Sequence, residues 1–152
     1  NLVSLNSQTK ENLRKYLDQY RMLTDEIRII DGFVVNIGVE FKIVVFKNYN
    51  MEEVLARSID AIQNFFDVDR WQINQPIILN DLYLEIARID GVQTVMDLKI
   101  TNKYRYKDGL DYQDYLYDID SATINGVIYP SLDPCIFEVR YPNSDIIGSA
   151  IQ

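Results

Sequence analysis

Few side chains in this sequence are of a type that carries out catalytic or metal chemistry. Histidine is absent, which removes the residue used most often as a general base and as a metal ligand. Cysteine occurs once, at Cys135, so the chain has neither the thiols for a zinc site nor a partner for an intrachain disulfide. Without a histidine base, a buried structural thiol is favoured over a nucleophile at Cys135. Glycine-rich phosphate-binding motifs are also missing.

Carboxylates are plentiful, so they have to be weighed as metal ligands or as an acid pair. A cluster of aspartates consists of Asp108, Asp111, Asp114, Asp118 and Asp120. Their spacing does not match the calcium loop, and a solvated acidic loop is favoured over a metal site. An acid pair for hydrolysis, Glu40 with Asp97 on neighbouring strands, stays an alternative, although solvent exposure explains both side chains more simply. We therefore predict no catalytic residue, no cofactor and no metal site.

Tyrosines gather in one stretch that has neither helical nor strand periodicity. They are Tyr104, Tyr106, Tyr112, Tyr115 and Tyr117. Tyrosine combines a large rigid contact area with a polar tip and is enriched in protein interfaces. Two interpretations stay open, a subunit interface and intramolecular cover for the sheet, because either one buries the rings. A stacking platform for nucleic acid ranks last, since the neighbouring aspartates would repel phosphate.

The overall composition is typical of a folded domain. With 152 residues, 47% of them hydrophobic, the chain can bury a core without disulfides, and we expect a single α+β domain. A net charge of −8 argues against binding to nucleic acid or to an anionic membrane surface. There is no signal peptide and no apolar run long enough to span a bilayer. Because the first residue is Asn1 rather than methionine, we expect a fragment of a longer chain.

The segment 31–101 is predicted to form a strand-helix-helix-strand core, with the helices on one face of a mixed sheet. Alternating apolar residues over 35–45 indicate a strand with one buried face. Gly38 marks a bend or a close approach in this strand. Asn50 is placed to cap the first helix, whose wide apolar face should cover the sheet.

The second half of this core is predicted from the spacing of its apolar residues, which changes from helical to alternating at Gly91. Asn80 is placed to cap a short helix, and Gly91 sits where a left-handed C-cap is wanted. After Gly91, strict alternation over 92–101 predicts a strand in which Val92, Thr94, Met96, Leu98 and Ile100 share a face. If this strand ran parallel to the first, the crossover would be right-handed.

The flanking segments are less regular. Residues 7–30 contain a helix capped by Ser7 or Thr9, with a stripe at Leu13, Tyr16, Leu17 and Tyr20, followed by a connection in which Ile27 and Ile29 suggest a short strand. Residues 102–123 form the tyrosine-rich insertion. Residues 124–152 are predicted to form C-terminal strands, one after the turn at 124–126 and one over 136–141, with a tail from 143 that lacks a packing pattern.

Several segments carry a resemblance to a known family. They are 13–17, 20–25, 35–39, Asp69-Arg70-Trp71-Gln72-Ile73-Asn74-Gln75-Pro76-Ile77, 91–95 and Gly126-Val127-Ile128-Tyr129-Pro130-Ser131-Leu132-Asp133-Pro134-Cys135-Ile136-Phe137-Glu138-Val139. Together they resemble the C-terminal part of the baseplate wedge proteins of T-even-type contractile-tailed bacteriophages, within the wider baseplate J-like family.

The resemblance implies a structural role without catalysis. Proteins of this type build the wedges of the tail baseplate and join into a ring around its hub. The implied partners are copies of the chain and other wedge proteins, with no nucleic acid, membrane or small-molecule substrate. The implied location is the virion tail baseplate, assembled in the host bacterial cytoplasm as a homo-oligomer. The hypothesis is that the tyrosine stretch 104–117 and an exposed sheet edge form the subunit contacts. The alternatives are an adaptor domain that binds by strand addition and, behind it, the carboxylate-dependent hydrolase.

Overall fold

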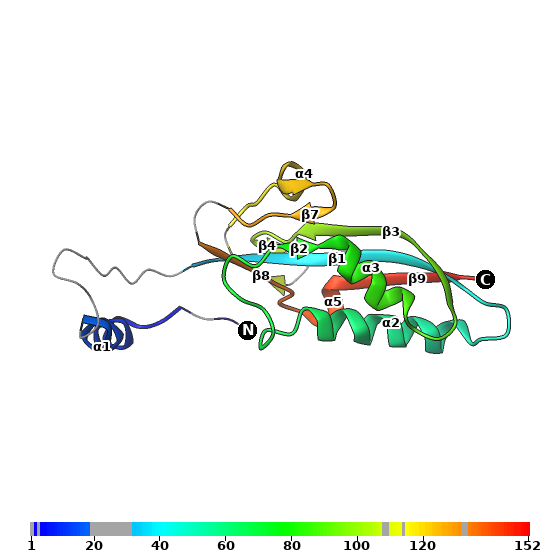
Figure 1. Cartoon of the computed structure of the whole chain (residues 1–152), viewed down its shortest axis with the longest axis horizontal. Coiled ribbons are helices and arrows are strands. Elements are labelled where there is room, and N and C mark those ends of the chain that lie inside the picture. Colours follow the sequence, from blue (N-terminus) through cyan, green and yellow to red (C-terminus); the bar gives the residue numbers. More distant parts are fainter. Residues whose placement is uncertain (1, 3, 19–31, 108–109, 114, 132–133) are drawn as a thin grey trace.

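The computed structural model describes residues 2, 4–18, 32–107, 110–113, 115–131 and 134–152 (Figure 1). The fold is α+β, as predicted, and is built around a mixed four-stranded sheet. The strands of this main sheet are β1 (Phe33–Val45), β3 (Val92–Asn102), β8 (Cys135–Glu138) and β9 (Ile146–Ile151). β3 runs antiparallel to β1 along one side, while β8 and β9 pair in parallel with β1.

Helices and two smaller sheets complete the described part of the chain. The helices are α1 (Ser7–Asp18), α2 (Met51–Phe65), α3 (Leu79–Ala87), α4 (Ile119–Ala122) and α5 (Pro142–Asp145). One small sheet joins β2 (Ile77–Ile78), β7 (Val127–Ile128) and β6 (Thr123–Ile124), and the other joins β4 (Tyr106–Lys107) and β5 (Leu110–Asp111). The predictions for Tyr20, Ile27 and Ile29 lie outside the described residues.

The two helices between β1 and β3 explain why these strands are antiparallel. α2 leads the chain back along the sheet from the end of β1, and α3 returns it to that end, where β3 begins (Figure 1). A pair of helices thus reverses the chain twice before β3 reverses it again. The right-handed crossover considered for parallel strands does not arise, because that rule applies to parallel pairs alone.

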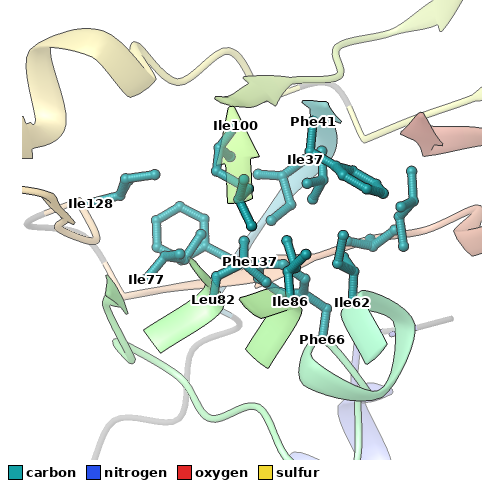
Figure 2. Packing of buried hydrophobic residues seen from close by; sticks show 14 of the residues in the cluster. Ile37, Phe41, Ile62, Phe66, Ile77, Leu82, Ile86, Ile100, Ile128 and Phe137 are labelled. Carbon is teal, nitrogen blue, oxygen red and sulfur yellow. The ribbon is translucent and has the colours of Figure 1, made fainter. Parts of the chain in front are cut away.

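The core lies between the main sheet and these helices. Every second residue of β1 from Val35 to Val45 is buried, which confirms the predicted half-buried strand. Figure 2 shows the side chains that meet these residues. They include Ile62 of α2, Leu82 and Ile86 of α3, Ile100 of β3 and Phe137 of β8.

Two helices begin at a side-chain cap from a neighbouring residue, and a third begins at a hydrogen bond from a segment far away in the sequence. The Asn50 side chain accepts a hydrogen bond from the Glu53 N–H at 3.2 Å, as predicted. α1 is capped by Asn6, whose oxygen accepts from the Thr9 N–H, rather than by Ser7 or Thr9. The predicted cap at Asn80 is wrong, because α3 begins at Leu79. Leu79 donates its N–H to the Gly126 carbonyl at 2.9 Å, so the β6–β7 hairpin takes the place of a side-chain cap.

The strict alternation predicted for β3 is wrong because its register with β1 shifts at two places. One extra residue lies between Val92 and Thr94, and another lies between Met96 and Lys99, where Asp97 has a φ of 53°. Each bulge exchanges the two faces of the strand. Val95 is therefore buried in the core, while Met96 is turned to the opposite face.

The expectation that the tail from residue 143 lacks a packing pattern is also wrong, since β9 adds a strand to the main sheet. Ile146 faces the core at the start of β9, but the next two core-facing positions are small residues, Gly148 and Ala150, while Ile147 and Ile151 point to the other side. This arrangement removes the usual alternation signal. β8 ends at Glu138 rather than Tyr141, and β8 and β9 each pair with β1 rather than with each other.

Gly91 has a left-handed backbone conformation that favours glycine. Its φ of 98° confirms the predicted left-handed conformation, although α3 already ends at Ala87. A Cβ at this position would lie 2.8 Å from both the Tyr49 ring and the Val54 side chain. We expect Gly91→Ala to lower the free energy of unfolding by about 1–2 kcal/mol, measured by urea denaturation.

Gly126→Ala is the matched control for this prediction. Gly126 also has a positive φ, 77°, but nothing lies within 4 Å of the position of its Cβ. It should therefore lose only the backbone component, roughly 1 kcal/mol or less. Equal losses for the two variants would show that the contacts around Gly91 contribute nothing.

Candidate functional site

The helices cover one face of the main sheet and leave part of the opposite face bare. Since residues paired across strands share a face, the register defines three rows along the later part of β1. The rows are Ile147-Glu40-Lys99, Ser149-Lys42-Met96 and Ile151-Val44-Thr94. Lys42 and Val44 are half-buried and the others are exposed. We call these residues the open face.

The open face combines apolar and charged side chains. Met96 is 40% exposed, Ile147 53% and Ile151 42%. The charged members are Glu40, Lys42 and Lys99, so the face has a positive net charge in a chain whose total is −8. Apolar side chains among polar ones are typical of surfaces that pack against another protein.

The earlier part of the same face is covered by the tyrosine stretch. Tyr112 is buried there, and its hydroxyl donates a hydrogen bond to Asp145 Oδ1 at 2.6 Å. The Tyr112 ring packs edge-on against Tyr141, with centroids 5.4 Å apart. Tyr112 thus connects the insertion to α5, the turn between β8 and β9.

Tyr115 and Tyr117 pack against the core at the start of β1. The Tyr115 ring stacks on Phe33 with centroids 4.6 Å apart and an interplanar angle of 7°. Tyr117 lies against Phe137 and donates its hydroxyl hydrogen to the Tyr129 carbonyl. Burial raises the pKa of Tyr117 above its usual value, with smaller contributions from Cys135 and Tyr115. These contacts hold the insertion to the body of the protein.

The other two tyrosines of the stretch have different surroundings. Tyr104 is half-buried, with the Arg105 guanidinium 4.8 Å from its ring centroid. The Tyr106 backbone forms part of β4, and its side chain lies outside the described residues. Of the two interpretations left open, the structure shows intramolecular cover for Tyr112, Tyr115 and Tyr117. Because these three rings pack inside the protein, replacing them with serine would disturb folding. A test of whether copies of the chain associate therefore has to use other residues.

Buried polar groups lie beneath the tyrosine stretch, and sequence reasoning missed them. Asn36 and Glu138 are each 1% exposed and Asp145 is 3% exposed. The Gln113 N–H donates to Asn36 Oδ1 at 2.7 Å, and the Leu2 N–H donates to Glu138 Oε2 at 3.0 Å. The sequence carried one sign that this face is covered. Gly38 was predicted to mark a bend or a close approach of another segment, and the structure confirms the close approach. A Cβ there would lie 2.7 Å from the Lys103 side chain.

Two of the grooves in the described part of the chain are candidate binding sites. One, of about 560 Å³, lies beside α2 and α3 and is lined by Phe65, Trp71 and Asp81, among others. Trp71 is buried against Phe65 and Phe66, so it joins the connection after α2 to the core. The other, of about 410 Å³, follows the outer edge of β3 and is lined by residues that include Ile100 and Leu116.

The main chain of β3 points into this second groove at Ile100. The Lys103 N–H donates to the Asn36 carbonyl at 2.8 Å, so in an antiparallel ladder Thr101 and Lys99 also bond toward β1. The N–H and C=O groups of Ile100 then point toward the outer edge. An extended polypeptide could pair with them.

The acidic residues show no common centre in the described part of the chain, where no group of potential metal ligands is found. Asp118 caps α4, and its hydrogen bonds from the Ser121 hydroxyl and N–H lower its pKa. Asp108 and Asp114 lie outside the described residues. Glu40 stands opposite Lys99 in the register and Asp97 lies in a bulge, so the two acids do not form a cross-strand pair. Neither lines either groove.

Cys135 is buried at the start of β8, as predicted for a structural thiol. Its sulfur accepts a hydrogen bond from the Ser131 N–H at 3.3 Å, and its own N–H donates to Asn74 Oδ1. These contacts tie Ser131 and Asn74 to the start of β8.

None of the helices in the described segments has the length and apolar character needed to cross a membrane. Comparison with models of known protein families found no match. Comparison with curated proteins likewise found no match.

Proposed function

We propose that this chain is a structural assembly module that joins copies of itself and other wedge proteins in the tail baseplate of a contractile phage. The observation that carries the proposal is the open face, where Met96, Ile147 and Ile151 lie exposed on the face of the main sheet opposite α2 and α3. The resemblance to baseplate wedge proteins suggests the assembly. The proposal includes no catalytic step.

The size of the exposed apolar surface indicates how strong such a contact would be. Full burial of a large apolar side chain contributes about 1.5–3 kcal/mol, and these three are already about half-buried. Covering them would contribute roughly 2–4 kcal/mol, while association costs about 4–15 kcal/mol in lost freedom of motion. These three side chains alone do not offset that cost, so the charged and polar residues around them have to contribute as well. We expect weak association of the isolated chain, which several simultaneous contacts in a ring would strengthen.

Sedimentation velocity over a concentration series up to about 1 mM, where weak contacts begin to be populated, tests this proposal. We expect the wild-type chain to associate as its concentration rises. The double variant Met96→Asp, Ile147→Asp should stay monomeric with an unchanged circular dichroism spectrum. Ile73→Asp, at an exposed isoleucine away from the open face, is the matched control and should associate like the wild type. A wild-type chain that stays monomeric, or a double variant that associates equally well, would reject the proposal.

A second candidate is an adaptor domain that binds an extended segment at the outer edge of β3. The groove at Ile100 and the exposed Leu116 at its rim favour it. The left-handed Asp97 limits it, because a bulge interrupts strand pairing beyond Leu98. If this candidate were correct, a partner's extended segment would bind the open-face variant as well as it binds the wild type, and Leu116→Asp would abolish that binding.

A further inference from the structure

We infer that copies of this chain associate head to tail, with the open face of one copy resting on the helix layer of the next. The helix layer is the exposed surface of α2, α3 and the turn that ends at Asp90. This inference rests on the proposed function and specifies which surfaces meet. The two surfaces lie on opposite faces of the main sheet, so every copy presents both.

Charge complementarity is the first argument. The exposed charged residues of the helix layer are Glu52, Glu53, Arg57, Asp60, Asp81, Glu85, Arg88 and Asp90. The two arginines pair with Glu53 and Glu85, which leaves the remaining carboxylates without an ion pair in the described part of the chain. Lys42 and Lys99 of the open face have no ion pair there either. Opposite charges therefore remain available on the two faces of the sheet.

Apolar complementarity is the second argument. Leu84 and Tyr83 are exposed on α3. Asp81, Leu84 and Glu85 recur at the i, i+3, i+4 spacing that places them on one side of a helix. The outer surface of α3 is thus an apolar strip bordered by acids. The open face is its counterpart, in which Met96 and Ile147 are bordered by lysines.

The other arrangements of two copies are electrostatically weaker. Open face against open face would bring together two surfaces that each carry two lysines and one glutamate. Helix layer against helix layer would oppose two acidic surfaces. Only the head-to-tail contact sets a positive surface against a negative one. A contact between two different patches repeats from copy to copy, which generates a ring when the rotation closes.

Two charge-reversal variants of exposed residues test this arrangement. The face variant carries Lys99→Glu and Ser149→Glu, which makes the open face negative. The layer variant carries Asp60→Lys, Asp81→Lys and Asp90→Lys, which makes the helix layer positive. Each variant alone should associate about tenfold more weakly than the wild type in low salt, because like charges then meet at the contact.

An equimolar mixture of the two variants tests whether opposite charges restore the contact, while comparison of the two single variants separates the head-to-tail contact from open face against open face. Each copy then finds an oppositely charged neighbour on at least one side, and the mixture should recover association to the wild-type level. If the layer variant associates as well as the wild type while the face variant does not, the open faces pair with each other and the inference is wrong. Failure of the mixture to recover association also overturns it. Failure of the wild type itself to associate would instead reject the proposed function.

Discussion

Gly148→Ala is expected to lower the free energy of unfolding by about 1–3 kcal/mol, although it adds only one methyl group. β9 lies beside β1 with Gly148 opposite Phe41, and the Phe41 ring extends over the glycine. A Cβ on residue 148 would lie 2.3 Å from Phe41 Cζ and 2.6 Å from Phe41 Cε1. The ring is buried in the core, so it can give way only by disturbing its neighbours.

A double-mutant cycle separates this steric cause from a general intolerance of β9. Phe41→Leu replaces the ring with a smaller aliphatic side chain and should itself cost about 1–3 kcal/mol through the cavity it leaves. In that background, Gly148→Ala should cost much less, because the new methyl group fills part of the cavity. Ser149→Ala, on the exposed side of the same strand, is the control and should stay within roughly 0.5 kcal/mol of the wild type. An equal cost of Gly148→Ala in both backgrounds would contradict the argument.

Tyr112→Phe should lower the free energy of unfolding by about 2–3 kcal/mol, which is large for the loss of one oxygen atom. The Tyr112 hydroxyl provides the hydrogen bond to Asp145 Oδ1, while Asp145 Oδ2 has no hydrogen-bond partner within the described chain. Removing this donor leaves a carboxylate that is 3% exposed without any side-chain hydrogen bond. Burial makes such a group costly, because water cannot replace the lost donor.

Tyr141→Phe is the matched control for this prediction. The Tyr141 hydroxyl accepts a hydrogen bond from the Asp111 N–H and donates one to the Asp111 carbonyl, but both bonds are exposed. Its loss should cost below about 1 kcal/mol, because water satisfies the freed groups. Thermal and urea unfolding of both variants would compare the two costs. Equal costs would show that the buried contact between Tyr112 and Asp145 does not anchor the tyrosine stretch.

The elements predicted correctly are those specified by neighbouring residues. Alternation over 35–45 marks β1, because one face of this strand packs against the helices along its length. The cap at Asn50 requires only a side chain and a backbone group three residues away. The Asn125-Gly126 turn, in which both residues have positive φ, forms a hairpin from its own two strands.

The elements that were missed depend on partners far away in the sequence. β9 has a glycine on its packed side at residue 148, because the Phe41 ring of another strand occupies the space above it. The bulges of β3 follow from its register with β1, and local alternation carries no sign of them. Asn36 and Asp145 look like solvent-exposed residues in the sequence, yet they are buried and bonded to a segment that begins after β3. Glu138 is buried too, and its carboxylate accepts a hydrogen bond from Leu2, near the start of the chain.

For this protein, the sequence alone determined the chemistry that is available: no imidazole, a single thiol, an excess of carboxylates and two helices that suit one face of a sheet. Residue types and periodicity are sufficient for that, because each is a property of the chain itself. Only the tertiary structure decided that Lys42, Lys99, Met96 and Ile147 share an uncovered face, opposite a helix layer rich in acids. That arrangement depends on the pairing register of β1 with β3 and β9, and a shift of one residue would turn a different set of side chains outward.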